Sequence, residues 1–153
     1  MRTRIYAALL LCAPLLIAPA IAGDAETAAM APVHRFIDSV DKGDMKAAAA
    51  TFASDASIID EFAPYHWQGN DAFAQWGADF DTMAKAGGIS GLVVTLRPPR
   101  HVNVTGDRGY AVVPALIVSR QNGKKMRERG TFTFALTNTA MGWRIAAWAW
   151  ATR

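Results

Sequence analysis

The sequence contains almost no cysteine and none of the common short catalytic motifs. Its single cysteine, Cys12, lies in the first 22 residues, so the rest of the chain offers no disulfide and no thiol nucleophile. No H-x-H, HExxH, G-x-S-x-G, Walker A or G-x-G-x-x-G pattern occurs, and His34, His66 and His101 are scattered. We therefore expect no metal site and no cofactor.

A hydrophobic run long enough to span a membrane is also missing. Apolar residues fill 5–18, but this stretch is shorter than the roughly 20 residues that a span needs, and Pro14 interrupts it. Two arginines precede the run, and an A-x-A pattern ends at Ala22. The pattern predicts a signal peptide over 1–22 and a periplasmic or secreted protein, with no membrane contact after cleavage.

The chain lacks a strong excess of charge. Lysine and arginine number 16 against 13 acidic residues, and two of the arginines belong to the predicted signal peptide. Bulk charge therefore gives no reason to expect a nucleic-acid partner. The basic segment at 120–129 contains an Asn-Gly pair and is explained by a solvated hairpin.

The remaining residues form a leader and one domain. Residues 23–31 are small and polar and predict a flexible leader, whereas 32–152 are enough for one domain with its own core. Apolar residues at helical spacing predict a helix over 32–42 that ends at Gly43. Asp44 is the expected N-cap of a second, short, alanine-rich helix.

A third helix is predicted to begin at Asn70 and to end at Gly87. A strand is predicted over 57–62, between the second and third helices. Four further strands follow the third helix: 89–105 (broken at Pro98-Pro99), 109–119, 126–137 and 142–152. The predicted order is three helices, with one strand between the second and the third, followed by a meander of four strands. This order indicates an α+β fold.

Asp60 is the strongest candidate for catalysis. In the predicted strand 57–62, Ile58, Asp60 and Phe62 share one face because side chains alternate. A carboxylate between apolar neighbours is costly to keep charged, which raises its pKa toward the range of a general base. The same residues also fit a short strand with Asp60 in water at its end, and both interpretations stay open.

Glu128 is a second acid on a mostly apolar strand face, shared with Met126 and Phe132. Because it lies close to the hairpin turn, a surface pair with a neighbouring arginine is the favoured interpretation. His66 follows Asp60 in a segment that we expect to form a pocket rim. An ordinary loop histidine is a slightly better explanation of His66.

Aromatic residues are abundant. All five tryptophans lie after residue 22, and Trp148 and Trp150 share a strand face. Such density is typical of a core and also of a cavity for a small apolar molecule. The residues expected to bind that molecule are Phe36, Phe62, His66, Trp67, Trp76, His101, Glu128, Phe132 and Trp148.

The segment AVVPALIV (111–118) is apolar on both strand faces, which suggests a central strand covered on both sides. Only one of these faces can pack against the helices. The other face makes a homodimer through the sheet plausible.

Three phrases give the chain a family resemblance: "FIDSVDKGDMKAAAATFASDASIID", "WQGNDAFAQW" and the terminal "GWRIAAWAW". They resemble the nuclear transport factor two-like superfamily, including its SnoaL-like and ketosteroid isomerase-like proteins. The resemblance covers 32–152. It implies a cystatin-like cone, a SnoaL-like α+β barrel domain in which three N-terminal helices pack on a curved, mostly antiparallel sheet around an apolar cavity.

The stretch 34–76 lines up with the ketosteroid isomerase pattern without a gap. Asp60 then falls where that family keeps its proton-shuttling aspartate. The family's hydrogen-bond donors are not matched, because Phe36 takes the place of a helix-1 tyrosine and Gly130 lies at or near that of a protonated aspartate. Gly77 replaces a supporting tyrosine. Without such donors the main stabilisation of an enolate is lost, so steroid isomerisation is not expected.

Two functions therefore stay open. The first is an isomerase-, cyclase- or dehydratase-like enzyme with Asp60 as its base and His66, His101 or Trp148 as replacement donors. The second is a non-catalytic domain that binds a small ligand or another protein.

Overall fold

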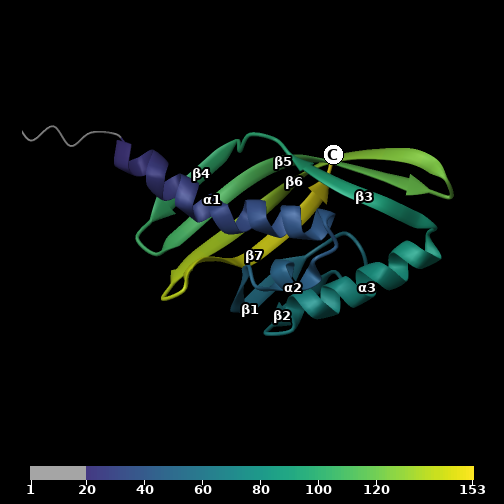
Figure 1. The fold of residues 1–153 in the computed structure, drawn as a ribbon, viewed down its shortest axis with the longest axis horizontal. Helices are drawn as coiled ribbons and strands as arrows, with labels where there is room; N and C mark the ends of the chain where they lie inside the picture. Colours follow the sequence, from purple (N-terminus) through teal and green to yellow (C-terminus); the bar gives the residue numbers. More distant parts are fainter. Residues whose placement is uncertain (1–19) are drawn as a thin grey trace, which may run out of the picture.

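The computed structural model describes residues 20–153, in which helices pack on a curved sheet (Figure 1). The helices are α1 (Ala20–Asp41), α2 (Met45–Ala49) and α3 (Ala72–Ala86), and the strands are β1 (Phe52–Ile59), β2 (His66–Gly69), β3 (Ile89–Leu96), β4 (His101–Thr105), β5 (Arg108–Gln121), β6 (Lys124–Thr139) and β7 (Gly142–Thr152). The predicted α+β class is confirmed. Apart from its last three residues, the predicted signal peptide 1–22 lies outside the described residues. Within 20–153, no helix has the length and apolar character needed to cross a membrane.

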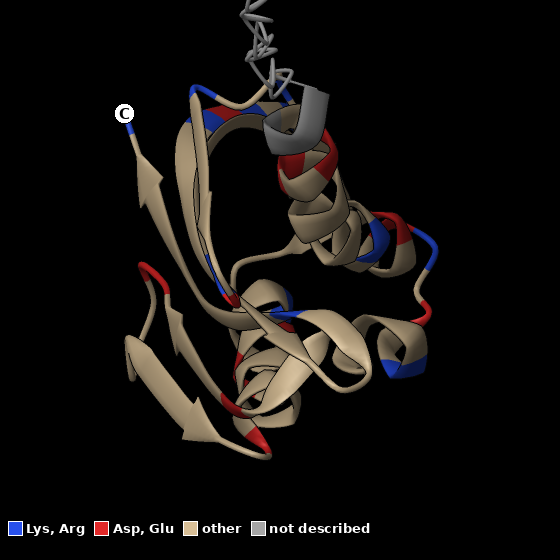
Figure 2. Ribbon diagram, turned by 90° about the vertical axis from the view of Figure 1, so that its left-hand side faces the viewer, with Lys and Arg blue, Asp and Glu red and all other residues tan. Residues whose placement is uncertain are grey.

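The strands form one mixed sheet in the order β2-β1-β7-β6-β5-β3, with β4 paired to β5. Every pair is antiparallel except β1 and β7, which run parallel. The two longest strands, β5 and β6, are joined at Asn122 and Gly123, whose φ angles are 50° and 80°. An Asn-Gly pair favours such a turn because both residues tolerate positive φ. In Figure 2 the sheet curves around the inner side of the helices.

Helix α1 begins earlier than predicted. Residues 23–31, expected to be a flexible leader, are helical, and Ala29 and Met30 are buried in the core. Pro32 lies inside the helix rather than at its start, and its side chain is fully buried. Packing of this face against the sheet stabilises helical turns that local propensity does not predict across a proline.

The segment after α2 also differs from the prediction. Asp44 caps α2 as expected, with its Oδ1 accepting from Ala47 N at 2.9 Å, but β1 begins at Phe52 and ends at Ile59. Pairing of β1 with β7 overrides the helix propensity of the alanine-rich segment. The short strand β2 was not predicted.

The core lies between the helices and the inner face of the sheet. The largest fully buried side chains are Phe134, Ile58, Leu136, Ile145, Val33 and Val113. Burying each such side chain contributes roughly 1.5–3 kcal/mol. Strand β5 alternates between buried and half-buried residues, so only its inner face is fully covered. The expectation that both faces are covered is therefore wrong for the single chain.

Candidate functional site

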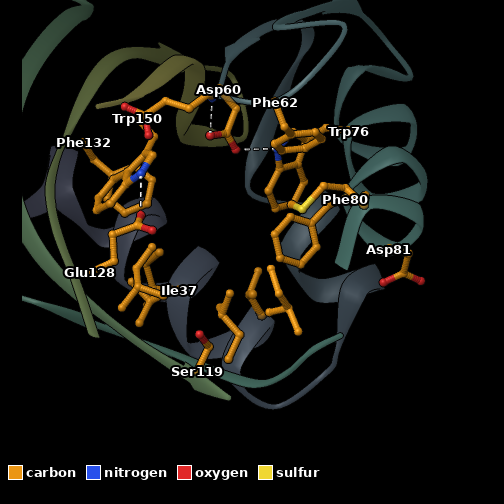
Figure 3. A pocket seen from close by; sticks show the side chains of 18 of the residues that line it. Ile37, Asp60, Phe62, Trp76, Phe80, Asp81, Ser119, Glu128, Phe132 and Trp150 are labelled. Atoms are coloured by element: carbon orange, nitrogen blue, oxygen red, sulfur yellow. Dashed lines mark hydrogen bonds between the residues drawn. The ribbon is translucent and has the colours of Figure 1, made fainter. Parts of the chain in front are cut away.

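A pocket of about 600 Å³ lies between α1, α3 and the inner face of the sheet (Figure 3). Its aromatic lining residues are Phe36, Phe62, Trp76, Phe80, Phe132, Trp148 and Trp150. Four acidic residues, Asp60, Glu61, Asp81 and Glu128, and one basic residue, Arg127, also line it. An apolar cavity with a few polar groups is the usual form of a small-molecule site.

Asp60 follows the last residue of β1 and turns its carboxylate into the pocket. Its Oδ2 accepts a hydrogen bond from Trp76 Nε1 at 2.9 Å, and its Oδ1 accepts from the Glu61 backbone N at 2.8 Å. Burial raises the pKa of Asp60 above its ordinary value of 3.8. The two hydrogen bonds lower this pKa and the neighbouring Glu61 carboxylate raises it, but both effects are smaller than that of burial. Of the two interpretations of Asp60, the structure supports the one that places it in a pocket.

Trp76 is held in place by the aromatic residues around it. It lies on the inner face of α3, and its ring stacks on Phe73 and Phe80 with centroid distances of 5.7 and 5.4 Å. Its other neighbour, Trp148, meets it edge-on at 5.4 Å. Offset-stacked and edge-to-face arrangements are both favourable for aromatic pairs. The indole N–H that contacts Asp60 is therefore fixed in direction.

Glu61 ties the loop after β1 to the end of β7. Its Oε1 accepts from the backbone N of Thr152 at 2.6 Å and from the Thr152 hydroxyl at 2.9 Å. The Asp60 backbone N donates to the Tyr65 carbonyl at 3.2 Å and closes the other side of the loop. These contacts hold Asp60 at one edge of the pocket.

Glu128 contacts the pocket from β6 on a different side (Figure 3). Its Oε1 accepts from Trp150 Nε1 on the neighbouring strand at 3.1 Å. The predicted surface pair with an arginine is wrong, since the one ion pair found in residues 20–153 joins Arg108 to Asp107. Strand alternation places the Glu128 side chain opposite those of the arginines beside it in the sequence.

Gly130 makes room for the Trp150 indole. A Cβ at Gly130 would overlap this ring and the Ala151 carbonyl oxygen. The ring of Trp150 lies against Phe132, with centroids 4.6 Å apart. An indole therefore fills the space next to the position at which the family resemblance implied an aspartate.

The indole nitrogen of Trp148, Nε1, is buried and has no hydrogen-bond partner. In the described part of the chain it is the one buried polar side-chain atom of this kind. The ring borders the pocket and packs on Phe36, Trp76 and Phe132. A buried N–H without an acceptor is costly and calls for an explanation. Of the three replacement donors considered from the sequence, Trp148 alone belongs to the pocket wall.

Three residues expected to bind a ligand do not line the pocket. His66 is exposed and its Nε2 lies 3.0 Å from Ser57 Oγ, while His101 is exposed on β4. Trp67 is buried, and its Nε1 donates to Asp79 Oδ2 at 2.8 Å. Because β2 pairs with β1, alternation directs Trp67 into the core and His66 to the other face.

The other residues expected from the sequence do meet in the pocket: Phe36, Asp60, Phe62, Trp76, Glu128, Phe132 and Trp148. Sequence reasoning missed Trp150 and Glu61 as pocket residues. Trp150 had a usable signal, since it shares a strand face with Trp148. Glu61 had none, because its position depends on a contact with Thr152 at the far end of the chain.

Metal-binding residues do not gather in the part of the chain that the structure describes. No group of three or more His, Cys, Asp or Glu side chains there could hold an ion. The adjacent acids Asp60 and Glu61 contact Trp76 and Thr152 instead.

The sequence profile of the SnoaL-like domain matches residues 30–149. This chain belongs to the SnoaL-like family. The match begins within α1 and ends within β7, and it includes every residue that lines the pocket except Trp150. It agrees with the resemblance to ketosteroid isomerase-like and nuclear transport factor two-like proteins. No curated protein sequence matches this SnoaL-like chain.

Solved structures with the same fold include three bacterial proteins. An NTF2-like protein with a cystatin-like fold from Novosphingobium aromaticivorans is 20% identical, with a TM-score of 0.68 over 84% of this chain and 82% of that one. A ketosteroid isomerase-like protein from Erwinia carotovora atroseptica is 15% identical, with a TM-score of 0.66 over 83% and 95%. An NTF2-like superfamily protein from Salmonella enterica is 19% identical, with a TM-score of 0.69 over 85% and 92%. These likenesses establish the cystatin-like fold of the SnoaL-like domain.

Proposed function

We propose that this SnoaL-like domain binds a small, largely apolar molecule in its pocket and transfers a proton on it, with Asp60 as the base. The reaction would be that of a cofactor-independent isomerase, cyclase or lyase. The observation that carries the proposal is the Asp60 carboxylate, which lies in an aromatic pocket, is oriented by Trp76 and has a pKa raised by burial. The fold shared with a ketosteroid isomerase-like protein supports it.

The chemistry requires a base that is ionised before reaction and basic enough to take a proton from carbon. Burial makes Asp60 a stronger base than an aspartate in water, because its charged form loses solvation. The hydrogen bonds from Trp76 and the Glu61 backbone hold the carboxylate in one orientation. The protonated acid can then return the proton to another atom of the same molecule.

The proposal is tested by proton exchange on apolar cyclic ketones in D₂O, followed by ¹H NMR of their α-protons. Asp60→Asn is expected to lower the exchange rate by about 10²–10⁴-fold, the usual contribution of a positioned base. Asp81→Asn removes an acid at the pocket edge, beyond Phe80 in Figure 3, and is the matched control. An unchanged rate in Asp60→Asn, with unfolding curves showing both variants folded, would rule out Asp60 as the base.

A non-catalytic binding domain is the second candidate, and a specific observation favours it. Two pocket indoles already donate to carboxylates, Trp76 to Asp60 and Trp150 to Glu128. A developing enolate would therefore depend on Trp148 Nε1 or on a group of the ligand itself. This function predicts ligand binding without α-proton exchange and equal affinity in Asp60→Asn. A loss of affinity in that variant would count against it.

We also propose that the chain is exported. This rests on the sequence pattern of residues 1–22, with cleavage after Ala22. Mass spectrometry of the protein from a periplasmic fraction should show Gly23 as its first residue. Retention of Met1 in that fraction would contradict the proposal.

A homodimer through the sheet is a further proposal. On β5 the outward residues Val112, Pro114 and Leu116 are only half-buried in the single chain, and an apolar strand face of this kind favours a partner. Sedimentation analysis should give the mass of a dimer, and a monomer at all concentrations would remove the idea.

A further inference from the structure

Glu128 is unusual for its position in the chain. Residues 87–153 contain ten lysines and arginines but only two acids, Asp107 and Glu128. Asp107 pairs with Arg108 away from the pocket, whereas Glu128, although exposed, lines the pocket. Of the two acids in this basic part of the chain, Glu128 is therefore the one that borders the pocket.

The Glu128 carboxylate has much of its binding capacity free. Oε1 accepts one hydrogen bond from Trp150, and among residues 20–153 no cation lies within ion-pair distance of either oxygen. Arg127 borders the pocket, but because side chains alternate along β6, its side chain leaves the strand on the face opposite to that of Glu128. An ionised carboxylate can accept about four hydrogen bonds, so three acceptor sites remain for a ligand.

The walls around Glu128 suit a cation with an apolar body. The Trp150 indole meets Glu128 at its N–H edge and lies against Phe132, so aromatic rings stand next to the carboxylate. Tryptophan is the best aromatic partner for a cation that reaches its face. On another side of the same space lies the Asp60 carboxylate (Figure 3). Glu61, the next residue in the chain, also lines the pocket. An anionic ligand would be repelled by these carboxylates. Arg127 is the one basic residue among those that line the pocket.

We infer that the molecule in the pocket is an organic cation: an apolar body with a protonated amine that pairs with Glu128 beside Trp150. The body packs on the remaining aromatic residues and reaches toward Asp60. This inference rests on the proposed binding function and adds the class of ligand to it. Glu128 then acts as the residue that selects the charge of the ligand.

The test uses three probes of nearly equal shape: 1-adamantylamine, 1-adamantanol and adamantane-1-carboxylate. Their affinities for the full mature chain are measured by titration calorimetry at neutral pH, where the amine is a cation. We expect the amine to bind about five- to tenfold more tightly than the alcohol, as for a cation beside an exposed carboxylate and an indole. The carboxylate is expected to bind most weakly.

Glu128→Gln removes the charge and keeps an oxygen that can accept from Trp150 Nε1. It should abolish the preference for the amine and leave the affinity for the alcohol unchanged. Asp107→Asn, the other acid of the basic half, is the control and should keep the preference. Unfolding curves verify that both variants fold.

Several outcomes overturn the inference: equal or tighter binding of the alcohol or the carboxylate, an unchanged preference in Glu128→Gln, or no binding of the amine at millimolar concentration. The measurement does not involve proton exchange. Loss of exchange in Asp60→Asn without any charge preference would support the proposed catalysis and reject the organic cation. A preference for the amine without proton exchange would support the organic cation and reject the proposed catalysis.

Discussion

Trp76 Nε1 donates to Asp60 Oδ2 across 2.9 Å, and this bond joins the inner face of α3 to the loop after β1. The indole also stacks on Phe73 and Phe80, and these contacts hold the N–H donor in place. The bond favours the charged carboxylate and lowers its pKa, while burial raises that pKa by more. The pKa of Asp60 therefore reflects mainly burial, which raises it, opposed by the hydrogen bond from Trp76, which lowers it.

Trp76→Phe should raise the pKa of Asp60 further, because it removes the hydrogen bond that stabilises the charged form. The change is measured by following the aspartate carboxyl carbons by ¹³C NMR as the pH is varied. Trp67→Phe is the control, since that indole donates to Asp79 outside the pocket. A lower or unchanged pKa of Asp60 in Trp76→Phe would contradict the role given to the bond.

The pH dependence of stability should reveal Asp60. Because its folded-state pKa is above the ordinary 3.8, the folded protein holds this proton more tightly than the unfolded chain. This contribution is complete below pH 3.8 and is lost as the pH rises through the folded-state pKa. Relative to the wild type, Asp60→Asn should become more stable as the pH rises from about 4 to 7. The free energies of urea unfolding of both proteins at each pH test this, and a constant difference would show that burial does not raise the pKa.

Gly130→Ala should destabilise the protein by about 1–3 kcal/mol, as expected for overpacking against the Trp150 ring. Gly77→Ala is the matched control, because its Cβ would meet only Met45 Cε at 3.8 Å. Gly77 lies inside α3, where alanine should add roughly 0.5–1 kcal/mol of stability. Chemical denaturation measures both changes. Equal effects of the two substitutions would mean that the Trp150 ring can move aside.

Local signals predicted the sheet well where they were strong. Alternation over 126–137 correctly grouped Glu128 with Phe132, and the Asn-Gly pair located the hairpin between β5 and β6. The break at Pro98-Pro99 separates β3 from β4 as expected. These features depend on the order of residues in one strand or one turn.

Elements that depend on distant partners were not predictable in this way. β2 is only four residues long and exists through pairing with β1, and β1 itself pairs with β7 more than 80 residues away. His66 was expected at the pocket because it follows Asp60, and Trp67 was expected there as one of the abundant aromatic residues. Their pairing with β1 instead sends one to the surface and the other into the core.

The sequence by itself determined the family and the α+β class, because periodicity, turn chemistry and composition are local. It left open whether the aromatic residues line a cavity and whether Asp60 lies in it. Tertiary structure alone decided how the acids are used. Asp60 meets Trp76 from α3, and Glu128 meets Trp150 from β7 rather than the arginines beside it. The physical reason is that side-chain direction and desolvation depend on which strands and helices pack together, and these contacts join residues far apart in the chain.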